Sequence, residues 1–280
     1  MNILSDSRHF DGRQLRIRHA AQSTQCDMTF SLYLPPQAAR GRVPILTYLS
    51  GLTCTDENVA TKSGAQRYCA EHGVALLMPD TSPRGEGVPD DPEGAWDFGL
   101  GAGFYVDATQ SPWATHYQMQ RYIRDELRAL VEAEFPVDPT RAGIFGHSMG
   151  GHGALTLGLK NPDIWRSISA FAPICAPLHC PWGEKALGQY LGPDRGAWAD
   201  YDACALITRN ECPRTPLLVD QGEADTFLSA QLKPELLETA CAATDHPLEL
   251  HRRPGYDHSY WFISSFIGAH IDWHTAQLSR

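Results

Sequence analysis

Residue types that can perform acyl transfer occur along this 280-residue chain in the order serine, carboxylate, histidine. The serine, Ser148, stands between Gly146 and Gly150 in G-x-S-x-G spacing, directly after the apolar run 142–145. This spacing is typical of a nucleophile elbow, a sharp strand-to-helix turn that lifts one hydroxyl above a sheet. Glycine fits two residues before and after the serine, because a Cβ at either position would crowd so tight a turn.

A serine hydroxyl needs a histidine to accept its proton, and that imidazole needs a carboxylate to fix its tautomer. Among twelve histidines, His258 lies after a late apolar strand and before an amphipathic helix, where this chain order requires the base. Asp225, in the turn after a short apolar strand, is the favoured carboxylate. Asp220 still belongs to that predicted strand, and Glu223 and Asp257 stay open as alternatives.

The tetrahedral intermediate of acyl transfer carries an oxyanion that backbone N–H donors stabilise. The Met149 amide is one predicted donor, because it follows the serine and begins a helix whose N-terminus favours negative charge. The loop after the early apolar strand 43–49 supplies the other, and we predict the Leu52 amide. Cys54 lies two residues farther on. Its thiol is predicted to line the pocket and make the site sensitive to thiol reagents, with a core cysteine as the alternative.

The rest of the chain alternates strand and helix patterns, as in a mostly parallel sheet with helices on both faces. Residues 13–19 and 28–34 alternate apolar and polar side chains, which predicts an N-terminal antiparallel hairpin. A helix is predicted over residues 59–72. We therefore expect the α/β class and an α/β-hydrolase fold, as a single domain over residues 1–280 with a small cap-like excursion at about 173–205.

One long segment, residues 79–107, has no periodicity and is rich in Gly, Pro and Asp. A loop of this length is either functional or disordered. The aromatic residues Trp96, Phe98, Phe104 and Tyr105 favour a packed and functional loop.

Composition excludes several classes of protein. Hydrophobic residues make up 42% and charged residues 20%, as in a globular protein with a large core. The net charge of −10, with no basic run, excludes nucleic acid and anionic membranes as partners. The N-terminus lacks an apolar signal region and no apolar run approaches the ~18 residues that span a bilayer, so a cytoplasmic protein is predicted. Eight cysteines without C-x-x-C pairs indicate free thiols, and no ligand spacing such as H-E-x-x-H indicates a metal or cofactor.

Several motifs together resemble those of a known family. They are Leu49-Ser-Gly-Leu-Thr-Cys-Thr-Asp-Glu-Asn58, Pro79-Asp-Thr-Ser-Pro-Arg-Gly85, Asp97-Phe-Gly-Leu-Gly-Ala-Gly-Phe-Tyr-Val-Asp107, Gly146-His-Ser-Met-Gly-Gly-His-Gly-Ala-Leu155, Ser169-Ala-Phe-Ala-Pro173, Pro181-Trp-Gly183, Asp220-Gln-Gly-Glu-Ala-Asp-Thr-Phe-Leu228 and Gly255-Tyr-Asp-His-Ser-Tyr260. Across nearly its whole length the sequence resembles the S-formylglutathione hydrolases, also called esterase D.

The resemblance implies hydrolysis of the thioester S-formylglutathione to formate and glutathione, the second step of glutathione-dependent formaldehyde detoxification. It places the triad on Ser148, Asp225 and His258, in agreement with the chain-order argument. A homodimer is compatible with the resemblance, and nothing in the residues themselves indicates one.

An anionic tripeptide thioester as the small-molecule substrate calls for cations near the pocket mouth, and Lys62, Arg84 and Lys185 are the candidates. Trp96 and Trp182 are candidates for the pocket walls, with plain structural packing as the alternative for each.

Three other functions are compatible with these residues. The first is a general carboxylesterase for short acyl esters, and the second is acyl transfer to an acceptor other than water. The third is a binding or scaffold protein on the same fold, which a missing triad member would indicate. All three triad members are present here.

Overall fold

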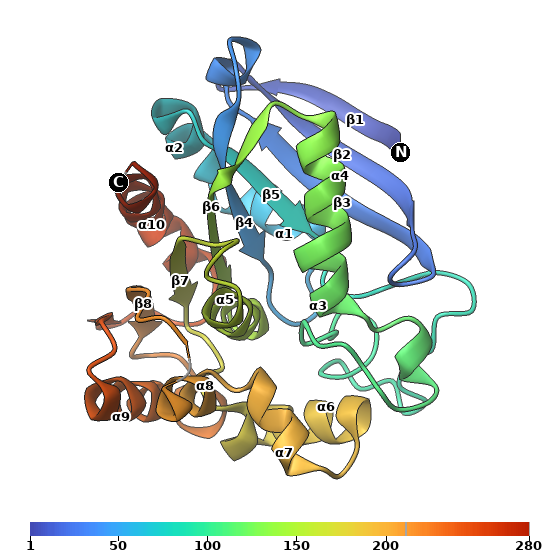
Figure 1. Cartoon of the computed structure of the whole chain (residues 1–280), viewed down its shortest axis with the longest axis vertical. Coiled ribbons are helices and arrows are strands. Elements are labelled where there is room, and N and C mark those ends of the chain that lie inside the picture. The colour runs from blue at the N-terminus through green and yellow to red at the C-terminus, as the bar shows by residue number, and fades with distance from the viewer. Residues whose placement is uncertain (211, 280) are drawn as a thin grey trace.

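A nine-stranded sheet forms the centre of the computed structural model, which describes residues 1–210 and 212–279 (Figure 1). The strands are β1 (Asn2–His9), β2 (Gly12–Ala21), β3 (Cys26–Leu34), β4 (Val43–Leu49), β5 (Ala75–Pro79), β6 (Val137–His147), β7 (Ser167–Phe171), β8 (Leu217–Gly222) and β9 (Leu248–Arg253). Their spatial order is β1-β2-β3-β5-β4-β6-β7-β8-β9. From β5 to β9 along this order the neighbours are parallel, whereas β1, β2, β3 and β5 pair antiparallel.

This architecture confirms the predicted α/β-hydrolase fold with a mostly parallel sheet and an N-terminal antiparallel hairpin. The hairpin gains a third strand, β1, which the sequence pattern did not reveal. The side chains of β1 are almost all exposed. An edge strand without a buried face lacks the alternation of apolar and polar residues that identifies a strand.

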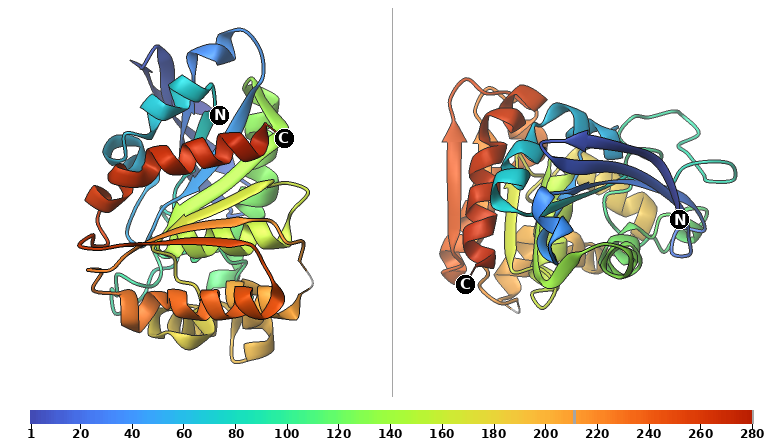
Figure 2. Two further views of the ribbon diagram at one scale, coloured as in Figure 1. Left: turned by 90° about the vertical axis from the view of Figure 1, so that its left-hand side faces the viewer. Right: turned by 90° about the horizontal axis from the view of Figure 1, so that it is seen from above.

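Helices cover both faces of the sheet (Figure 2). They are α1 (Asp56–Lys62), α2 (Ala65–His72), α3 (Met119–Arg121), α4 (Arg128–Glu134), α5 (Met149–Lys160), α6 (Pro181–Leu191), α7 (Arg195–Trp198), α8 (Ala203–Arg209), α9 (Pro234–Thr244) and α10 (Tyr260–Leu278). Adjacent residues of β6 face opposite sides of the sheet. Gly143 lies against His274 of α10 on one side, and Ile144 lies against Gly158 of α5 on the other. The nucleophile strand is therefore covered on both sides.

The helix predicted over residues 59–72 is wrong in its extent, because the structure contains two helices there. Thr55 caps α1, since its side chain accepts a hydrogen bond from the Glu57 amide, and the helix begins at Asp56. Gly64, with φ of 69°, separates α1 from α2 in the left-handed conformation that glycine adopts without strain. The break directs α1 along the loop that follows β4.

After Pro79, which ends β5, residues 80–107 contain no helix; the part from Phe98 onward is packed, as the aromatic content predicted, whereas residues 84–97 are exposed or half-buried. Phe98 is buried against Trp113 and Tyr190, with ring centroids 4.7 and 4.6 Å apart. Phe104 and Tyr105 are also buried, whereas Trp96 is 53% exposed.

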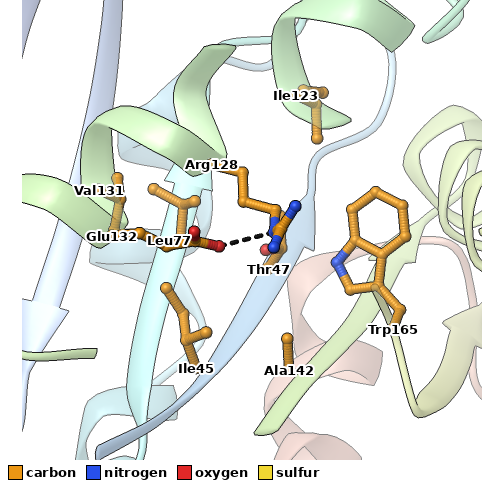
Figure 3. Close-up of a pocket in the computed structure, with 9 residues that line it drawn as sticks. All are labelled: Ile45, Thr47, Leu77, Ile123, Arg128, Val131, Glu132, Ala142 and Trp165. Carbon is orange, nitrogen blue, oxygen red and sulfur yellow. Dashed lines mark ion pairs between the residues drawn. The ribbon is translucent and has the colours of Figure 1, made fainter. Parts of the chain in front are cut away.

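A small pocket of about 20 Å³ lies between the sheet and the helical segment that ends in α4 (Figure 3). An ion pair between Arg128 and Glu132, with 2.6 Å between Nε and Oε1, lies in it. Its β4 residues, Ile45 and Thr47, precede the carboxyl end of that strand. Catalytic groups of this fold lie at the carboxyl ends of the strands, so this cavity is separate from the site described below.

Candidate active site

The predicted elbow joins β6 to α5. Ser148 adopts φ 58° and ψ −119°, a backbone conformation that is strained for a residue with a Cβ. Its N–H donates to the Phe171 carbonyl over 3.0 Å. A Cβ on Gly146 would collide with the Gly150 carbonyl, and one on Gly150 would collide with the Leu49 carbonyl. Gly146 therefore meets Gly150, as the spacing predicted, whereas Gly150 is required by the close approach of the β4 end rather than by Gly146.

His258 and Asp225 meet although 33 residues separate them. The His258 Nδ1 lies 2.5 Å from Asp225 Oδ2, and the other carboxylate oxygen accepts the Phe227 amide at 2.8 Å. A carboxylate at Nδ1 favours the tautomer with its proton there, which leaves Nε2 unprotonated. That nitrogen can accept a proton from Ser148, which lines the same pocket as His258.

The other candidate carboxylates have different positions and partners. Asp220 lies within β8, where it accepts from His251 Nδ1 at 2.9 Å and from Arg253 Nε at 3.0 Å. Asp257 is exposed and accepts the Ser259 amide at 2.9 Å. Glu223 is exposed in the turn after β8. Of these four carboxylates, Asp225 is the one whose oxygen bonds the His258 ring.

The predicted oxyanion donors flank the serine on two sides. Met149 is the first residue of α5, so its N–H has no acceptor within the helix. On the other side, a Cβ built on Gly51 would lie 3.2 Å from the Ser148 Cβ, so the loop after β4 reaches the elbow. Leu52 follows and lines the pocket. The Leu52 and Met149 amides thus lie on either side of Ser148, whose hydroxyl would be bonded to the tetrahedral intermediate.

These groups open into a pocket of about 330 Å³. Its lining residues are Gly51, Leu52, Thr53, Cys54, Asn58, Lys62, Trp96, His147, Ser148, Trp182, Phe227, His258, Ser259 and Tyr260. Among these lining residues there is one lysine, Lys62, and there is neither an arginine nor a carboxylate. The Lys62 Nζ lies 5.5 Å from the centroid of the Tyr260 ring. The charge of the lining therefore favours an anionic ligand.

Aromatic rings form one wall of this pocket. Trp96 meets Trp182 edge-on with centroids 5.5 Å apart, and Trp182 lies 4.8 Å from Phe227. Phe227 in turn meets the His258 ring edge-on at 5.1 Å. The wall runs from the exposed Trp96 to the half-buried His258, so it can exclude water from one side of that ring.

Comparisons with known proteins agree with this geometry. A family model described as "Putative esterase" matches residues 21–273. The S-formylglutathione hydrolases of Rattus norvegicus and Mus musculus are each 49% identical over 277 residues, covering 99% of this chain and 98% of each relative. The chain belongs to the S-formylglutathione hydrolase family of esterases. An S-formylglutathione hydrolase from Agrobacterium tumefaciens, 48% identical, superposes with a TM-score of 0.97 over 99% of this chain and 100% of that one.

Two of the cations predicted at the mouth of this esterase pocket lie elsewhere. The Arg84 Nε pairs with Asp80 at 2.9 Å, and its Nη2 donates to the Cys54 carbonyl at 3.1 Å. The Lys185 Nζ pairs with Asp97 at 2.5 Å. Neither cation lines the pocket in the part of the chain that the structure describes. A carboxylate binds each one: Asp80 lies four residues before Arg84 in the same loop, whereas Asp97 is 88 residues from Lys185 and spacing along the sequence does not reveal that pair.

His147 is a pocket residue that sequence reasoning set aside, because it directly precedes the serine. Its ring lies 4.4 Å from the His258 ring, and it is 6% exposed. Burial, and then the charge of His258, lower its pKa well below the usual value, so it stays neutral beside the base. The other lining residues that were not predicted are Gly51, Thr53, Asn58, Phe227, Ser259 and Tyr260. Their position within the quoted motifs was the available signal for all of them.

Cys54 lines the pocket as predicted, and burial raises the pKa of its thiol, which the nearby Lys62 offsets only in part. Thiol reagents attack the thiolate. We therefore expect iodoacetamide to inactivate ester hydrolysis slowly at pH 7 and progressively faster as the pH rises toward the thiol pKa. Inactivation rates measured with a short aryl ester as substrate would show this.

Replacing Cys54 by Ser should abolish the inactivation. Cys26→Ser, on β3 and outside the pocket, is the matched control and should be inactivated like the wild type. Unchanged inactivation of Cys54→Ser would place the sensitive thiol elsewhere.

Proposed function

We propose that the protein hydrolyses S-formylglutathione to formate and glutathione through a formyl ester on Ser148. The observation that carries the proposal is the His258–Asp225 pair, which opens into the pocket that also contains Ser148. Full-length similarity to two proteins named S-formylglutathione hydrolase supports the substrate.

In the first half-reaction, the Ser148 Oγ attacks the thioester carbonyl carbon while His258 Nε2 accepts the hydroxyl proton. Asp225 holds the imidazolium that forms and offsets its charge. The carbonyl oxygen becomes an oxyanion that accepts from the Leu52 and Met149 amides, and each well-aimed donor lowers the barrier by about 3 kcal/mol. The carbon–sulfur bond then breaks, and the glutathione sulfur takes the proton from His258, which returns the imidazole to its neutral form.

In the second half-reaction, water attacks the formyl ester. His258 accepts a proton from the water, the same two amides stabilise the second oxyanion, and collapse returns the proton to Ser148 as formate leaves. The aromatic wall of Trp96, Trp182 and Phe227 would limit access of bulk water to His258 during this cycle.

Lys62 is the residue that we propose for the glutathione portion of the substrate. Glutathione carries two carboxylates and one ammonium group, so its net charge is negative. Lys62 is exposed at the pocket, and among the residues that the structure describes no carboxylate lines this pocket. The amide of Asn58, one helical turn before Lys62 on α1, adds a polar group beside this charge.

Turnover of S-formylglutathione by the purified protein is the direct test of the proposal. We expect Ser148→Ala to lower kcat by about 10⁴-fold or more, because the hydroxyl makes the covalent bond. Thioester loss can be followed by its absorbance. Wild-type protein that fails to hydrolyse this thioester would contradict the substrate, and an active Ser148→Ala would contradict the mechanism.

The competing function is a general short-chain carboxylesterase. Its test compares kcat/KM for S-formylglutathione with kcat/KM for a short aryl ester on the same preparation. A higher value for the aryl ester would favour the general esterase.

For Lys62→Ala we expect KM for S-formylglutathione to rise about three- to fivefold, as for the loss of one exposed ion pair. The kcat should be unchanged, since the contact lies away from the reacting atoms. Lys185→Gln is the control and should leave KM unchanged, because its cation pairs with Asp97. A neutral aryl ester should not distinguish Lys62→Ala from wild type, and equal KM values for the thioester would contradict the assignment.

Assembly and location stay predictions. No helix in residues 1–210 and 212–279 combines the length and apolar character needed to cross a membrane. We propose a homodimer in the cytoplasm. Sedimentation velocity would measure the assembly, and a monomer at micromolar concentration would contradict it.

A further inference from the structure

The loop that contains Leu52 forms most of its hydrogen bonds with residues of one other loop, which follows β5. We call residues 50–54 the oxyanion loop and residues 79–107 the aromatic loop. The reaction proposed above uses no side chain of the aromatic loop except Trp96. Yet the aromatic loop hydrogen-bonds the backbone of the oxyanion loop at Ser50, Thr53 and Cys54.

The first two contacts flank the donor peptide itself. The Leu52 N–H belongs to the peptide between Gly51 and Leu52. On one side of it, the Ser50 carbonyl accepts from the Tyr105 hydroxyl at 2.7 Å. On the other side, the Thr53 N–H donates to the Gly101 carbonyl at 2.9 Å. Because peptide units are planar, fixing both neighbouring peptides restricts the direction of the Leu52 N–H.

A third contact fixes the end of the oxyanion loop. The Cys54 carbonyl accepts from the Thr81 hydroxyl at 2.5 Å and from Arg84 Nη2 at 3.1 Å. Asp80, which is 6% exposed, holds the Arg84 guanidinium through Nε. Arg84 therefore connects a buried carboxylate to the backbone of the oxyanion loop.

Backbone strain occurs at the same contacts. Thr53, Phe104 and Tyr105 all have positive φ, at 67°, 48° and 53°. Strained conformations persist only where the surrounding contacts enforce them, and they are frequent at functional sites. Gly101, with φ of 79°, lies so close that a Cβ on it would be 3.1 Å from the Thr53 Cα.

Tyr105 also contacts the element that carries the other donor. A Cβ on Gly153 of α5 would lie 2.5 Å from the Tyr105 Cδ2. The tyrosine ring is thus packed against the nucleophile helix while its hydroxyl bonds the oxyanion loop. Burial raises the pKa of Tyr105 well above its usual value, so the hydroxyl remains a donor throughout the working pH range.

We propose that Tyr105 and Arg84 are positioning residues that fix the Leu52 amide, and its separation from the Met149 amide, for the oxyanion. The inference rests on the proposed serine mechanism. Oxyanion donors act on charge that develops in the transition state. Loss of positioning therefore lowers kcat and leaves the binding of the ground-state substrate unchanged.

The test is Tyr105→Phe, which keeps the ring against α5 and removes the bond to the Ser50 carbonyl. Removing an oxyanion donor outright costs about 10²–10³ in kcat, so misaiming one should cost on the order of tenfold. We expect kcat for S-formylglutathione to fall about tenfold and KM to stay within about twofold. Affinity for a small alkylboronic acid, whose tetrahedral serine adduct places an oxygen between the two amides, should weaken by a similar factor.

Tyr117→Phe is the matched control. Tyr117 is equally buried, and its hydroxyl donates to the Pro89 carbonyl of the aromatic loop, also at 2.7 Å. The control should lose similar thermal stability but keep kcat and boronate affinity within about twofold. Equal losses of kcat in both variants, or no loss in Tyr105→Phe, would overturn the proposal.

Arg84→Gln is the second variant and decides the case if Tyr105→Phe does not fold. A lower kcat with unchanged KM is expected. A higher KM with unchanged kcat would assign Arg84 to substrate binding and overturn its positioning role. Each variant is also assayed with a short aryl ester that reacts through Ser148. The inference can then fail while the proposed substrate holds, and the substrate can fail while the inference holds.

Discussion

The structure of the site depends on the close approach of two backbones at the elbow. The Leu49 carbonyl at the end of β4 lies where a Cβ of Gly150 would be, and the Gly150 carbonyl lies where a Cβ of Gly146 would be. No side chain fits between these chains. The approach brings the oxyanion loop beside Ser148 and the first turn of α5. A larger residue at either glycine would force the two backbones apart and move the proposed donors away from the serine.

Behind the elbow, α10 supports the strand that Ser148 bonds. The Ser148 N–H donates to the Phe171 carbonyl, and the Phe171 ring stacks on His270 with centroids 3.8 Å apart. The Ser169 hydroxyl lies 2.8 Å from both His270 Nδ1 and His274 Nε2. Burial lowers the pKa of both histidines, so neutral rings fill this region and hydrogen-bond β7. These polar groups connect the last helix to β7, and the buried Asp220 carboxylate lies 3.9 Å from His270 Nε2.

Electrostatics divide the pocket into two regions. At the base, Asp225 bonds the His258 ring, and burial lowers the pKa of the adjacent His147 so that it stays neutral and adds no competing charge. Farther from the base, Lys62 lies at the surface, and it is the single lysine among the described residues that line the pocket. In the proposed reaction, backbone amides and one ion pair stabilise the charge that develops on the reacting atoms, and the permanent charge of the ligand meets a solvent-exposed cation. The acidic net charge of the chain does not extend into the pocket lining.

The sequence by itself determined the fold class, the elbow and the order of Ser148, Asp225 and His258. These features follow from local sterics, from periodicity and from the rule that catalytic loops follow strands. The tertiary structure decided which charges meet. It paired Arg84 with Asp80 and Lys185 with Asp97, left Lys62 at the pocket, and placed His147 against the base. Asp80 and Arg84 are four residues apart in one loop, but Asp97 is 88 residues from Lys185, and only folding brings that pair together. For the same reason, only the folded chain shows that the aromatic loop bonds the oxyanion loop.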